Sequence, residues 1–280
     1  MRRAIDSPFY PEVRDRDDIS VLKCQKSGVI FLSSSEHIKI SQYQSEKDFK
    51  YWNAQDRKTA VLYGYEDTLR RFEHFKHIIA QKRWIDVGTG AGGILDYLSQ
   101  ISSETVAVEP QESAREALIE SGYKVYPSLN EVPHEDFEVA TLFHVLEHLT
   151  KPIEVLETLR EKMLKGGKLI VEVPHAKDFL LSFLDLDSFK SFTFWSVHLI
   201  LHTRESLRIF LEQAGFSNIS IVGFQRHSVV NHLHWLAKGK PGGHIEWDHL
   251  RTNELDIAYG SMLASIDNTD TLIAVASNNE

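Results

Sequence analysis

Apolar and polar residues follow a regular pattern over the middle of the chain, from residue 83 to residue 173. Short apolar runs predict strands, and apolar residues at helical spacing predict helices between most of them. The expected strands are 83–87, 105–109, 123–126, 137–143 and 168–173. The expected helices are 92–100, 111–121 and 153–164, the last of which ends at Lys165-Gly166-Gly167 with glycine at the C′ position. Strands that alternate with helices indicate βαβ units, and therefore a parallel sheet covered on both faces.

Outside this region the pattern is less regular. Residues 46–80 have apolar side chains at helical spacing, and segment 28–32 has the composition of a short strand. Downstream, a helix is expected from Thr203 to Gly215. The last two expected strands are 218–223 and 270–277. They are separated by far more residues than a hairpin needs, so we expect the intervening segment to be functional or to cover an exposed surface.

Length and composition limit the class of protein. A chain of 280 residues suits one large domain with at most a small extension. No apolar run approaches the roughly 20 residues that span a bilayer, and the first residues lack the apolar core of a signal peptide, so we expect a cytoplasmic protein. With 31 basic and 40 acidic residues the net charge is −9, which argues against bulk nucleic acid as the main partner. The one cysteine, Cys24, excludes an internal disulfide and a cysteine-rich zinc site.

A glycine-rich segment, Asp86-Val-Gly88-Thr-Gly90-Ala-Gly92-Gly93, follows the first of these strands and opens the next helix. Without side chains, Gly88 and Gly90 allow backbone amides to approach a ligand, and a helix N-terminus favours negative charge. Nineteen residues after Gly90, at the tip of the next strand, Glu109 is placed to accept hydrogen bonds from both ribose hydroxyls. Loop and acid together indicate an adenosine-type cofactor; the alternative is a tight turn beside an ordinary surface glutamate.

Two cofactors fit this plan. The spacing Gly88-x-Gly90-x-x-Gly93 satisfies the dinucleotide fingerprint, which makes an NAD-dependent oxidoreductase the rival interpretation. Asp86 opposes it, because a buried carboxylate at the strand end would repel a pyrophosphate but would anchor the amino group of a methionine moiety. The segment therefore favours S-adenosylmethionine.

These residues resemble the signature of class I S-adenosylmethionine-dependent methyltransferases, Asp-x-Gly-x-Gly-x-Gly followed by an acidic strand end. The resemblance covers roughly residues 65–277 and implies a doubly wound α/β fold with a mostly parallel seven-stranded sheet, here with an N-terminal extension and an insertion before the last strand. It also implies that Asp86 and the glycines hold the methionyl part and that Glu109 holds the ribose. The expected cofactor-binding residues are Asp86, Gly88, Thr89, Gly90, Gly92, Glu109, Pro110, Leu129, Phe143 and His144.

The fourth strand of the pattern runs into Phe143-His144-Val-Leu-Glu147-His148-Leu149. This segment is similar to the Phe-His-Val-Leu-Glu-His segment of a methyltransferase subgroup that includes sugar and ubiquinone-pathway enzymes. It lies at the carboxyl end of a strand, where open α/β sheets bind their ligands. The resemblance implies that His144 lines the cofactor pocket. His148 is a candidate general base or substrate contact; the alternative is a structural histidine bonded to the backbone.

The segment Phe194–Ser206 resembles the stretch before the penultimate helix of sugar methyltransferases. His198 occupies the position of the histidine that is the catalytic base in carbon-methylating deoxysugar enzymes. Trp195 and Val197 stand where those enzymes have tyrosine and glutamate, so the carbon-methylation apparatus is incomplete. A free imidazole, with a pKa of about 6.5, accepts a hydroxyl proton at neutral pH. We therefore expect His198, and secondly His148, to be the base; the alternative for His198 is a capping or core role.

Glu147, His148 and His198 also allow a metal-binding interpretation. Small-RNA 2′-O-methyltransferases have Glu-x-x-Glu-His at this point and a later histidine, all of them metal ligands, whereas this chain has His144 in place of the first glutamate. Nitrogen-rich ligation would shift the preference from Mg²⁺ toward Zn²⁺-like metals. The prediction from the sequence is a site without metal, with these three residues as the alternative ligand set.

Four further residues are expected to bind the acceptor, because they follow strands or lie in segments near the ligand edge of the sheet: His175, Trp195, Arg226 and Asn231. Segments 175–202 and 226–268 are expected to form the acceptor site. Residues 61–280 are expected to form the cofactor-binding domain. Residues 1–60 are expected to be an extension, in which Lys23–Leu32 resembles a remnant of the zinc module of the carbon-methylating enzymes and binds no zinc.

The resulting prediction is an O-methyltransferase that acts on a small molecule, either a carbohydrate or a sugar-nucleotide intermediate, as in surface polysaccharide biosynthesis, with an oligomer allowed. Carbon or nitrogen methylation of another small metabolite is the first alternative. A nonenzymatic cofactor-binding scaffold is the second, and it would need Asp86 and Glu109 but would tolerate the loss of His148 and His198.

Overall fold

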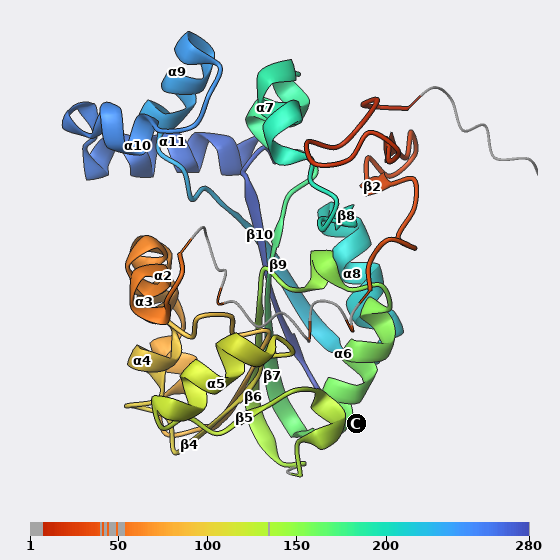
Figure 1. Cartoon of the computed structure of the whole chain (residues 1–280), viewed down its shortest axis with the longest axis vertical. Helices are drawn as coiled ribbons and strands as arrows, with labels where there is room; N and C mark the ends of the chain where they lie inside the picture. The colour runs from red at the N-terminus through yellow and green to blue at the C-terminus, as the bar shows by residue number, and fades with distance from the viewer. Residues whose placement is uncertain are drawn as a thin grey trace, which may run out of the picture.

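The computed structural model describes residues 8–39, 41, 44, 49, 54–133 and 135–279. Its main element is a seven-stranded sheet of order β5-β4-β3-β6-β7-β10-β9 (Figure 1). The strands are β3 (Arg83–Val87), β4 (Glu104–Val108), β5 (Val125–Tyr126), β6 (Phe137–Phe143), β7 (Met163–Pro174), β9 (Ser217–Phe224) and β10 (Thr271–Ser277). The first five are parallel, and β10 is antiparallel to both β7 and β9. The expected doubly wound, mostly parallel seven-stranded sheet is confirmed.

Successive residues of each strand point to opposite faces of the sheet, so each strand contributes to two cores. Ile85, Val106 and Leu142 belong to one core, together with α6 (Pro152–Glu161) and α8 (Arg204–Gln213). The neighbouring positions, such as Trp84 and Ala107, belong to the other. That second core includes side chains of α3 (Tyr65–Ile79), α4 (Leu95–Leu98) and α5 (Glu112–Glu120).

Two helix boundaries differ from the expectation. Helix α6 ends at Glu161, and Lys165-Gly166-Gly167 lies within β7 rather than at a helix C-terminus. The Asn278 side-chain amide donates hydrogen bonds to the carbonyls of Arg160 and Met163, so a tertiary contact replaces the expected glycine cap. Helix α4 is a single turn, because Gly92 is left-handed and α4 begins only at Leu95.

The helical region expected over 46–80 is divided. Within the described residues it consists of α2 (Arg57–Tyr63) and α3, which meet at Gly64. Residues 46–48 and 50–53 of the expected region lie outside the described residues. The expected domain boundary at residue 60 falls inside α2.

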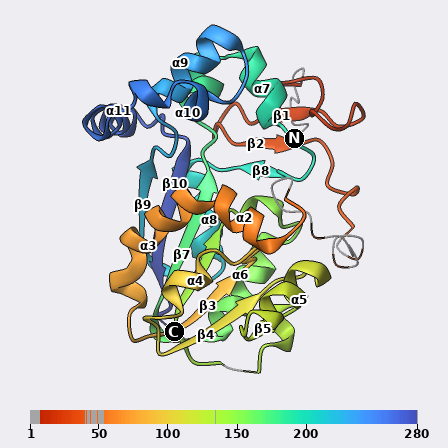
Figure 2. The same ribbon diagram turned by 60° about the vertical axis from the view of Figure 1, so that its left-hand side comes forward.

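A second, three-stranded antiparallel sheet joins the N-terminal segment to the chain after β7 (Figure 2). It consists of β1 (Val21–Lys23), β2 (Ile30–Leu32) and β8 (Ile200–Leu201). Ile19, Val21 and Ile30 share a small core with residues such as Phe194 and Leu201. The N-terminal segment is therefore held against the 194–201 region rather than standing apart.

A layer of short helices stands above the carboxyl ends of the parallel strands (Figure 1). It contains η3 (Phe179–Phe183), α7 (Asp187–Thr193), α9 (Val229–Lys238), α10 (Gly243–Glu246), η4 (Asp248–Leu250) and α11 (Asn253–Ser265). Two further short turns, η1 (Leu129–Glu131) and η2 (Leu146–His148), follow β5 and β6. Among the described residues, the structure has no helix with the length and apolar character that a bilayer crossing requires.

Candidate functional site

The glycine loop after β3 is held in a shape that requires glycine. Gly88, Gly90 and Gly92 have φ values of +72°, +59° and +70°. A Cβ on Gly88 would lie 2.6 Å from Val145 Cγ2, so close packing as well as backbone conformation excludes a side chain there. The loop is thereby packed against the segment that carries His144 and Glu147.

The loop amides are already hydrogen-bonded inside the protein. The N–H groups of Gly88 and Thr89 donate to the Val108 carbonyl, and that of Gly90 donates to Glu109. The expectation that these amides face a ligand is therefore not met, and the single turn of α4 offers little helix dipole. A pyrophosphate needs such donors, whereas an ammonium group needs acceptors, so the loop suits the methionine moiety better than a dinucleotide.

Two buried carboxylates bracket this loop. Asp86, in β3, accepts a hydrogen bond from Thr141 Oγ1 at 2.5 Å, and burial raises the pKa of Asp86 to about 6. Glu109, directly after β4, accepts hydrogen bonds from the Gly90 and Gln111 N–H groups, both at 2.8 Å. The carbonyl oxygen of the Gln111 side chain is buried and has no hydrogen-bond partner among the described residues. Sequence reasoning missed Gln111.

A network of buried charges continues from β6 to α3 and to the end of β9. His144, left-handed with φ +56°, has Nδ1 3.0 Å from Glu147 Oε1 and Nε2 3.2 Å from Glu172 Oε1. Arg226 lies 3.0 Å from His144 Nε2 and forms an ion pair with Asp67. Burial and Arg226 oppose protonation of His144, but its bonds to Glu147 and Glu172 raise its pKa. The network links the end of β6 with β7, α3 and the end of β9.

Glu172 is the centre of this network and was not predicted. Arg70 binds both of its carboxylate oxygens, at 2.8 and 2.9 Å, and Arg71 binds Oε1 at 2.6 Å. Burial alone would raise the pKa of Glu172, but Arg71, His144 and Arg70 lower it well below the usual range. An acid within the apolar run Leu169–Val173 was the available signal, because a buried carboxylate requires partners.

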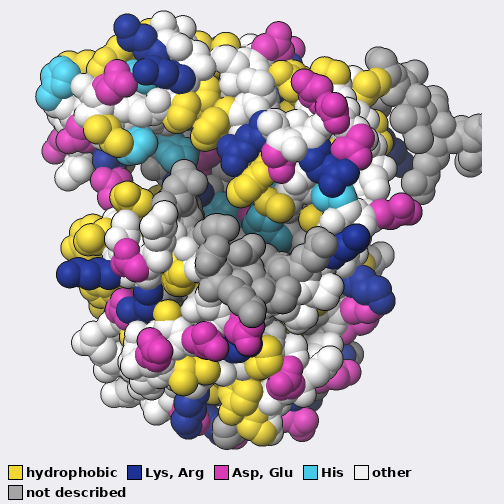
Figure 3. Space-filling model, viewed as in Figure 1, with side chains coloured by type: hydrophobic (Ala, Val, Ile, Leu, Met, Phe, Trp, Pro, Cys, Tyr) yellow, Lys and Arg dark blue, Asp and Glu magenta, His cyan; other side chains and the backbone are white. Residues whose placement is uncertain are grey.

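A cluster of possible metal ligands lies next to the end of β6. Glu147 and His148 come from the turn after β6, and His198 comes from the segment before β8. One ligand-type atom from each residue lies within 4.8 Å of the other two, and the His148 and His198 rings are 5.0 Å apart. His148 Nδ1 donates to the Val197 carbonyl at 2.7 Å, which leaves Nε2 as the acceptor nitrogen. Figure 3 shows histidine side chains gathered in the middle of this face, between the upper helices and the lower part of the molecule.

The charge states in this cluster are set by burial and proximity. Burial opposes ionisation of Glu147, but the hydrogen bond and the charge of His144, together with the charges of His148 and His198, lower its pKa to about 2. Burial and the charge of His148 lower the pKa of His198 to about 4. At neutral pH the cluster therefore combines a carboxylate with an uncharged His198.

The four expected acceptor residues occupy different environments. Trp195 lies beside the cluster of Glu147, His148 and His198. Its ring is 5.9 Å from that of His198, and 37% of its surface is exposed. Arg226 is tied to His144 and Asp67, as described above. His175 is buried, its Nδ1–H donates to the Thr269 carbonyl at 2.9 Å, and burial lowers its pKa to about 4. Asn231 is buried in the first turn of α9.

Among the remaining expected cofactor residues, two have side chains in the core. Phe143 stacks on Phe75 at 5.5 Å, and Leu129 belongs to the core that includes α6. Both side chains therefore pack mainly against the protein interior. The Pro110 carbonyl accepts a hydrogen bond from Arg115 at 2.9 Å.

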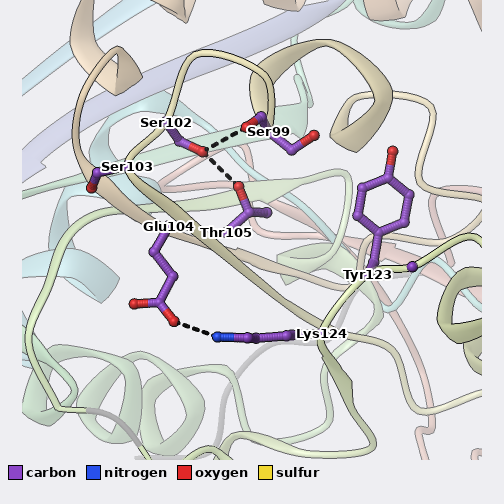
Figure 4. Close-up of a pocket in the computed structure, with 8 residues that line it drawn as sticks. Ser99, Ser102, Ser103, Glu104, Thr105, Tyr123 and Lys124 are labelled. Atoms are coloured by element: carbon purple, nitrogen blue, oxygen red, sulfur yellow. Dashed lines mark hydrogen bonds and ion pairs between the residues drawn. The ribbon is translucent and has the colours of Figure 1, made fainter.

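A separate shallow pocket lies at the opposite edge of the sheet, at the amino ends of β4 and β5 (Figure 4). Its wall contains the Lys124–Glu104 ion pair, at 2.8 Å, and the hydrogen bond between Ser102 and Thr105. Open α/β sheets bind ligands at the carboxyl ends of their strands, so this pocket is not part of the candidate site.

Comparisons with known proteins concern the family and the fold of the chain. A family model described as a methyltransferase domain matches residues 44–221. A S-adenosylmethionine-dependent methyltransferase from Archaeoglobus fulgidus is 20% identical, with a TM-score of 0.53 over 79% of this chain and 94% of that one. Phosphoethanolamine N-methyltransferase 2 from Haemonchus contortus, solved with S-adenosyl-L-methionine, is 12% identical, with a TM-score of 0.52 over 90% of this chain and 62% of that one. At these identities the likeness concerns the fold. No curated protein matches the chain.

Proposed function

Since the chain belongs to the family of methyltransferase domains, we propose that it transfers the methyl group of S-adenosylmethionine to a hydroxyl of a carbohydrate or sugar-nucleotide intermediate. Family and fold make the protein a S-adenosylmethionine-dependent methyltransferase; the acceptor and the base are the proposal. The observation that carries it is the pair of imidazoles, His148 and His198, 5.0 Å apart beyond the carboxyl end of β6. Action in surface polysaccharide biosynthesis and a cytoplasmic location belong to the same proposal.

The residues around the glycine loop fit the cofactor. Asp86 would hold the ammonium group, and Glu109 with the unpaired Gln111 side-chain carbonyl would hold the ribose hydroxyls. The backbone of Gly88, Thr89, Gly90 and Gly92 would follow the methionyl part, and Pro110, Leu129, Phe143 and His144 would complete the pocket. When bound, the sulfonium supplies a methyl group that is already strongly electrophilic.

The protein then has to align the acceptor and take up its proton. His198 is uncharged at neutral pH and is our first choice of base; His148, with its Nε2 lone pair free and its side chain 36% exposed, is the second. The Trp195 ring beside His198 offers an apolar face for a sugar ring. His175, Arg226 and Asn231 remain candidates for acceptor binding. They belong to segments 175–202 and 226–268, the proposed acceptor-site elements within the domain of residues 61–280.

The experiment is an acceptor screen. The purified protein is incubated with S-adenosylmethionine and a panel of free sugars, sugar nucleotides and, for comparison, small amines, and products are identified by mass spectrometry. We expect a sugar or sugar nucleotide that gains one methyl group on oxygen. Methylation of amines alone, or of carbon in the sugar ring, would reject the proposed acceptor while leaving the enzyme class intact.

A further inference from the structure

The cluster of Glu147, His148 and His198 has features that proton transfer alone does not require. Glu147 is fully buried, and its Oε2 has no hydrogen-bond partner among the described residues. The Nδ1 atom of His198 is also buried and likewise unpaired within the described part of the chain. Buried polar atoms are normally bonded, so two atoms of this cluster lack the partner that such atoms usually have.

The surroundings of the cluster hold its side chains in position for such a partner. The N–H of His148 at Nδ1 donates to the Val197 carbonyl at 2.7 Å, which fixes the tautomer and leaves Nε2 as a free donor of electrons. The other oxygen of Glu147, Oε1, is held by His144 at 3.0 Å. Metal-binding histidines and carboxylates are oriented by second hydrogen bonds of this kind.

The spacing also suits an ion. The three ligand-type atoms lie within 4.8 Å of one another, and His148 Nε2 is 4.0 Å from Glu147 Oε1. Bonds of about 2.0–2.1 Å at tetrahedral angles place ligand atoms roughly 3.3 Å apart, so small side-chain movements close the site. Two imidazoles and one carboxylate form a three-ligand set that leaves a position open.

We propose that Glu147, His148 and His198 bind one divalent transition-metal ion, of the Zn²⁺ or Co²⁺ type rather than Mg²⁺, with an open coordination position toward the acceptor. Nitrogen ligands favour these ions, whereas Mg²⁺ prefers oxygen. This proposal replaces the expectation from the sequence that the site binds no metal. Binding of the ion does not depend on the reaction.

The role of the ion rests on the proposed function. A hydroxyl bound at the open position would have its pKa lowered by the ion and would lose its proton to solvent, and its oxygen would then take the methyl group as S-adenosylhomocysteine leaves. In the metal-free enzyme the imidazoles keep the role of base. His198 therefore has a role in both states. It is a ligand of the ion in the metal-loaded enzyme and a candidate base in the metal-free enzyme.

The test is a Co²⁺ titration of the full chain, prepared without a polyhistidine tag and stripped with a chelator. Visible absorption and calorimetry report the bound ion. We expect one Co²⁺ per chain, and at least a tenfold weaker affinity in Glu147→Gln and in His198→Asn, since even the loss of a residue that only orients a metal ligand costs about 10–100-fold. The control is His249→Ala, an exposed histidine of η4, which should bind as the native protein does.

Circular dichroism shows whether each variant is folded. If Glu147→Gln does not fold, His148→Gln replaces it, because that side chain is partly exposed. Absence of Co²⁺ bands in the native protein, or equal affinity in all variants, would overturn the proposal. Binding of S-adenosylhomocysteine is measured separately: its loss with Co²⁺ binding intact rejects the proposed function and not the metal site, and the reverse result rejects the metal site alone.

Discussion

The carboxylate of Glu109 accepts a hydrogen bond from the backbone N–H of Gly90 at 2.8 Å, so the acid after β4 fixes the loop after β3. The same carboxylate also accepts from the Gln111 N–H at 2.8 Å. The residue proposed to hold the ribose therefore also shapes the loop proposed to hold the methionyl part. Cofactor affinity and loop stability are coupled through one side chain.

Replacement of Glu109 by glutamine should reduce both the affinity for the cofactor and the stability of the protein. Glutamine has one acceptor oxygen in place of two, so one of the two backbone N–H groups loses its partner at a cost of about 1–3 kcal/mol. We expect that loss in urea unfolding, and at least a tenfold weaker affinity for S-adenosylhomocysteine by calorimetry. Glu112→Gln, an exposed position on α5, is the control and should change neither value. A folded Glu109→Gln protein with native affinity would contradict the assignment.

Replacement of Asp86 by asparagine should separate stability from binding. The unfolded side chain loses its proton near pH 4, whereas burial holds the folded pKa at about 6. Stability therefore falls as the pH rises through this window, and the ionised carboxylate costs on the order of 3 kcal/mol above it. We expect Asp86→Asn to leave the melting temperature of the cofactor-free protein at pH 7.5 unchanged or higher.

The same substitution should weaken S-adenosylhomocysteine binding at least tenfold, because the charge partner of the ammonium group is lost. For the native protein, affinity should fall as the pH drops below about 6, where Asp86 becomes protonated. Calorimetry between pH 5 and pH 8 checks this, with Asp86→Asn as the pH-insensitive comparison. Native affinity that is constant across the range would disprove the role.

Alanine at Gly88 should be more damaging than alanine at Gly122. Both glycines are left-handed, with φ +72° and +89°, but a Cβ at Gly122 meets open space, whereas at Gly88 it meets Val145. The conformational cost, about 1–2 kcal/mol, is shared, and the clash adds about 1–3 kcal/mol at Gly88 alone. Urea unfolding measures the difference. Equal losses in the two variants would show that the loop moves freely away from Val145.

Alanine at His198 or at His148 should impair turnover without impairing cofactor binding. A positioned base contributes about 10²–10⁴ in rate, so we expect kcat with the acceptor from the screen to fall within that range for the variant that removes the base. The affinity for S-adenosylhomocysteine should stay within about twofold. Unchanged kcat in the double variant would eliminate both histidines as the base.

Glutamine at Glu172 should destabilise the fold. Arg70 and Arg71 would keep their charges but lose their buried partner, which costs about 3–5 kcal/mol. Because the folded pKa of Glu172 lies well below its usual value, its contribution is complete above about pH 4.5 and is lost as the pH falls toward the folded pKa. Unfolding curves at pH 7 measure the loss. Glu138→Gln, which removes a partly exposed partner of Lys82, should cost less than about 1 kcal/mol.

The parallel part of the fold was predictable because each strand has its own local pattern. Strands β3 and β6 begin and end where their apolar runs do. In sheet β1-β2-β8 only β2 was predicted, within segment 28–32. Strands β1 and β8 and the pairing were not predictable, since these strands have two or three residues each and the sheet joins Ile30 to Leu201, far apart in the sequence. The end of α6 was misplaced for the same reason, because the side chain of Asn278, far along the chain, donates to the Arg160 carbonyl in the last turn of α6.

The residue types of the candidate site were easier to predict from the sequence than the contacts that these residues make. The acids Asp86 and Glu109 follow from residue type and spacing, and the structure brings Glu109 to the glycine loop. The direction of the loop amides did not follow, because hydrogen bonds to Val108 depend on the pairing of β3 with β4. The partners of Arg226 depend on tertiary packing as well, since Asp67 lies on α3 and Arg226 follows β9.

The charge network around Glu172 also has a consequence for evolution. Asp67, Arg70, Arg71, His144 and Arg226 all share partners with Glu172 or with one another. A single substitution at any of these positions would leave a buried charge without its partner. In related sequences we therefore expect these residues to be substituted together. Covariation across α3, β7 and the end of β9 would then mark the lineages that share this arrangement.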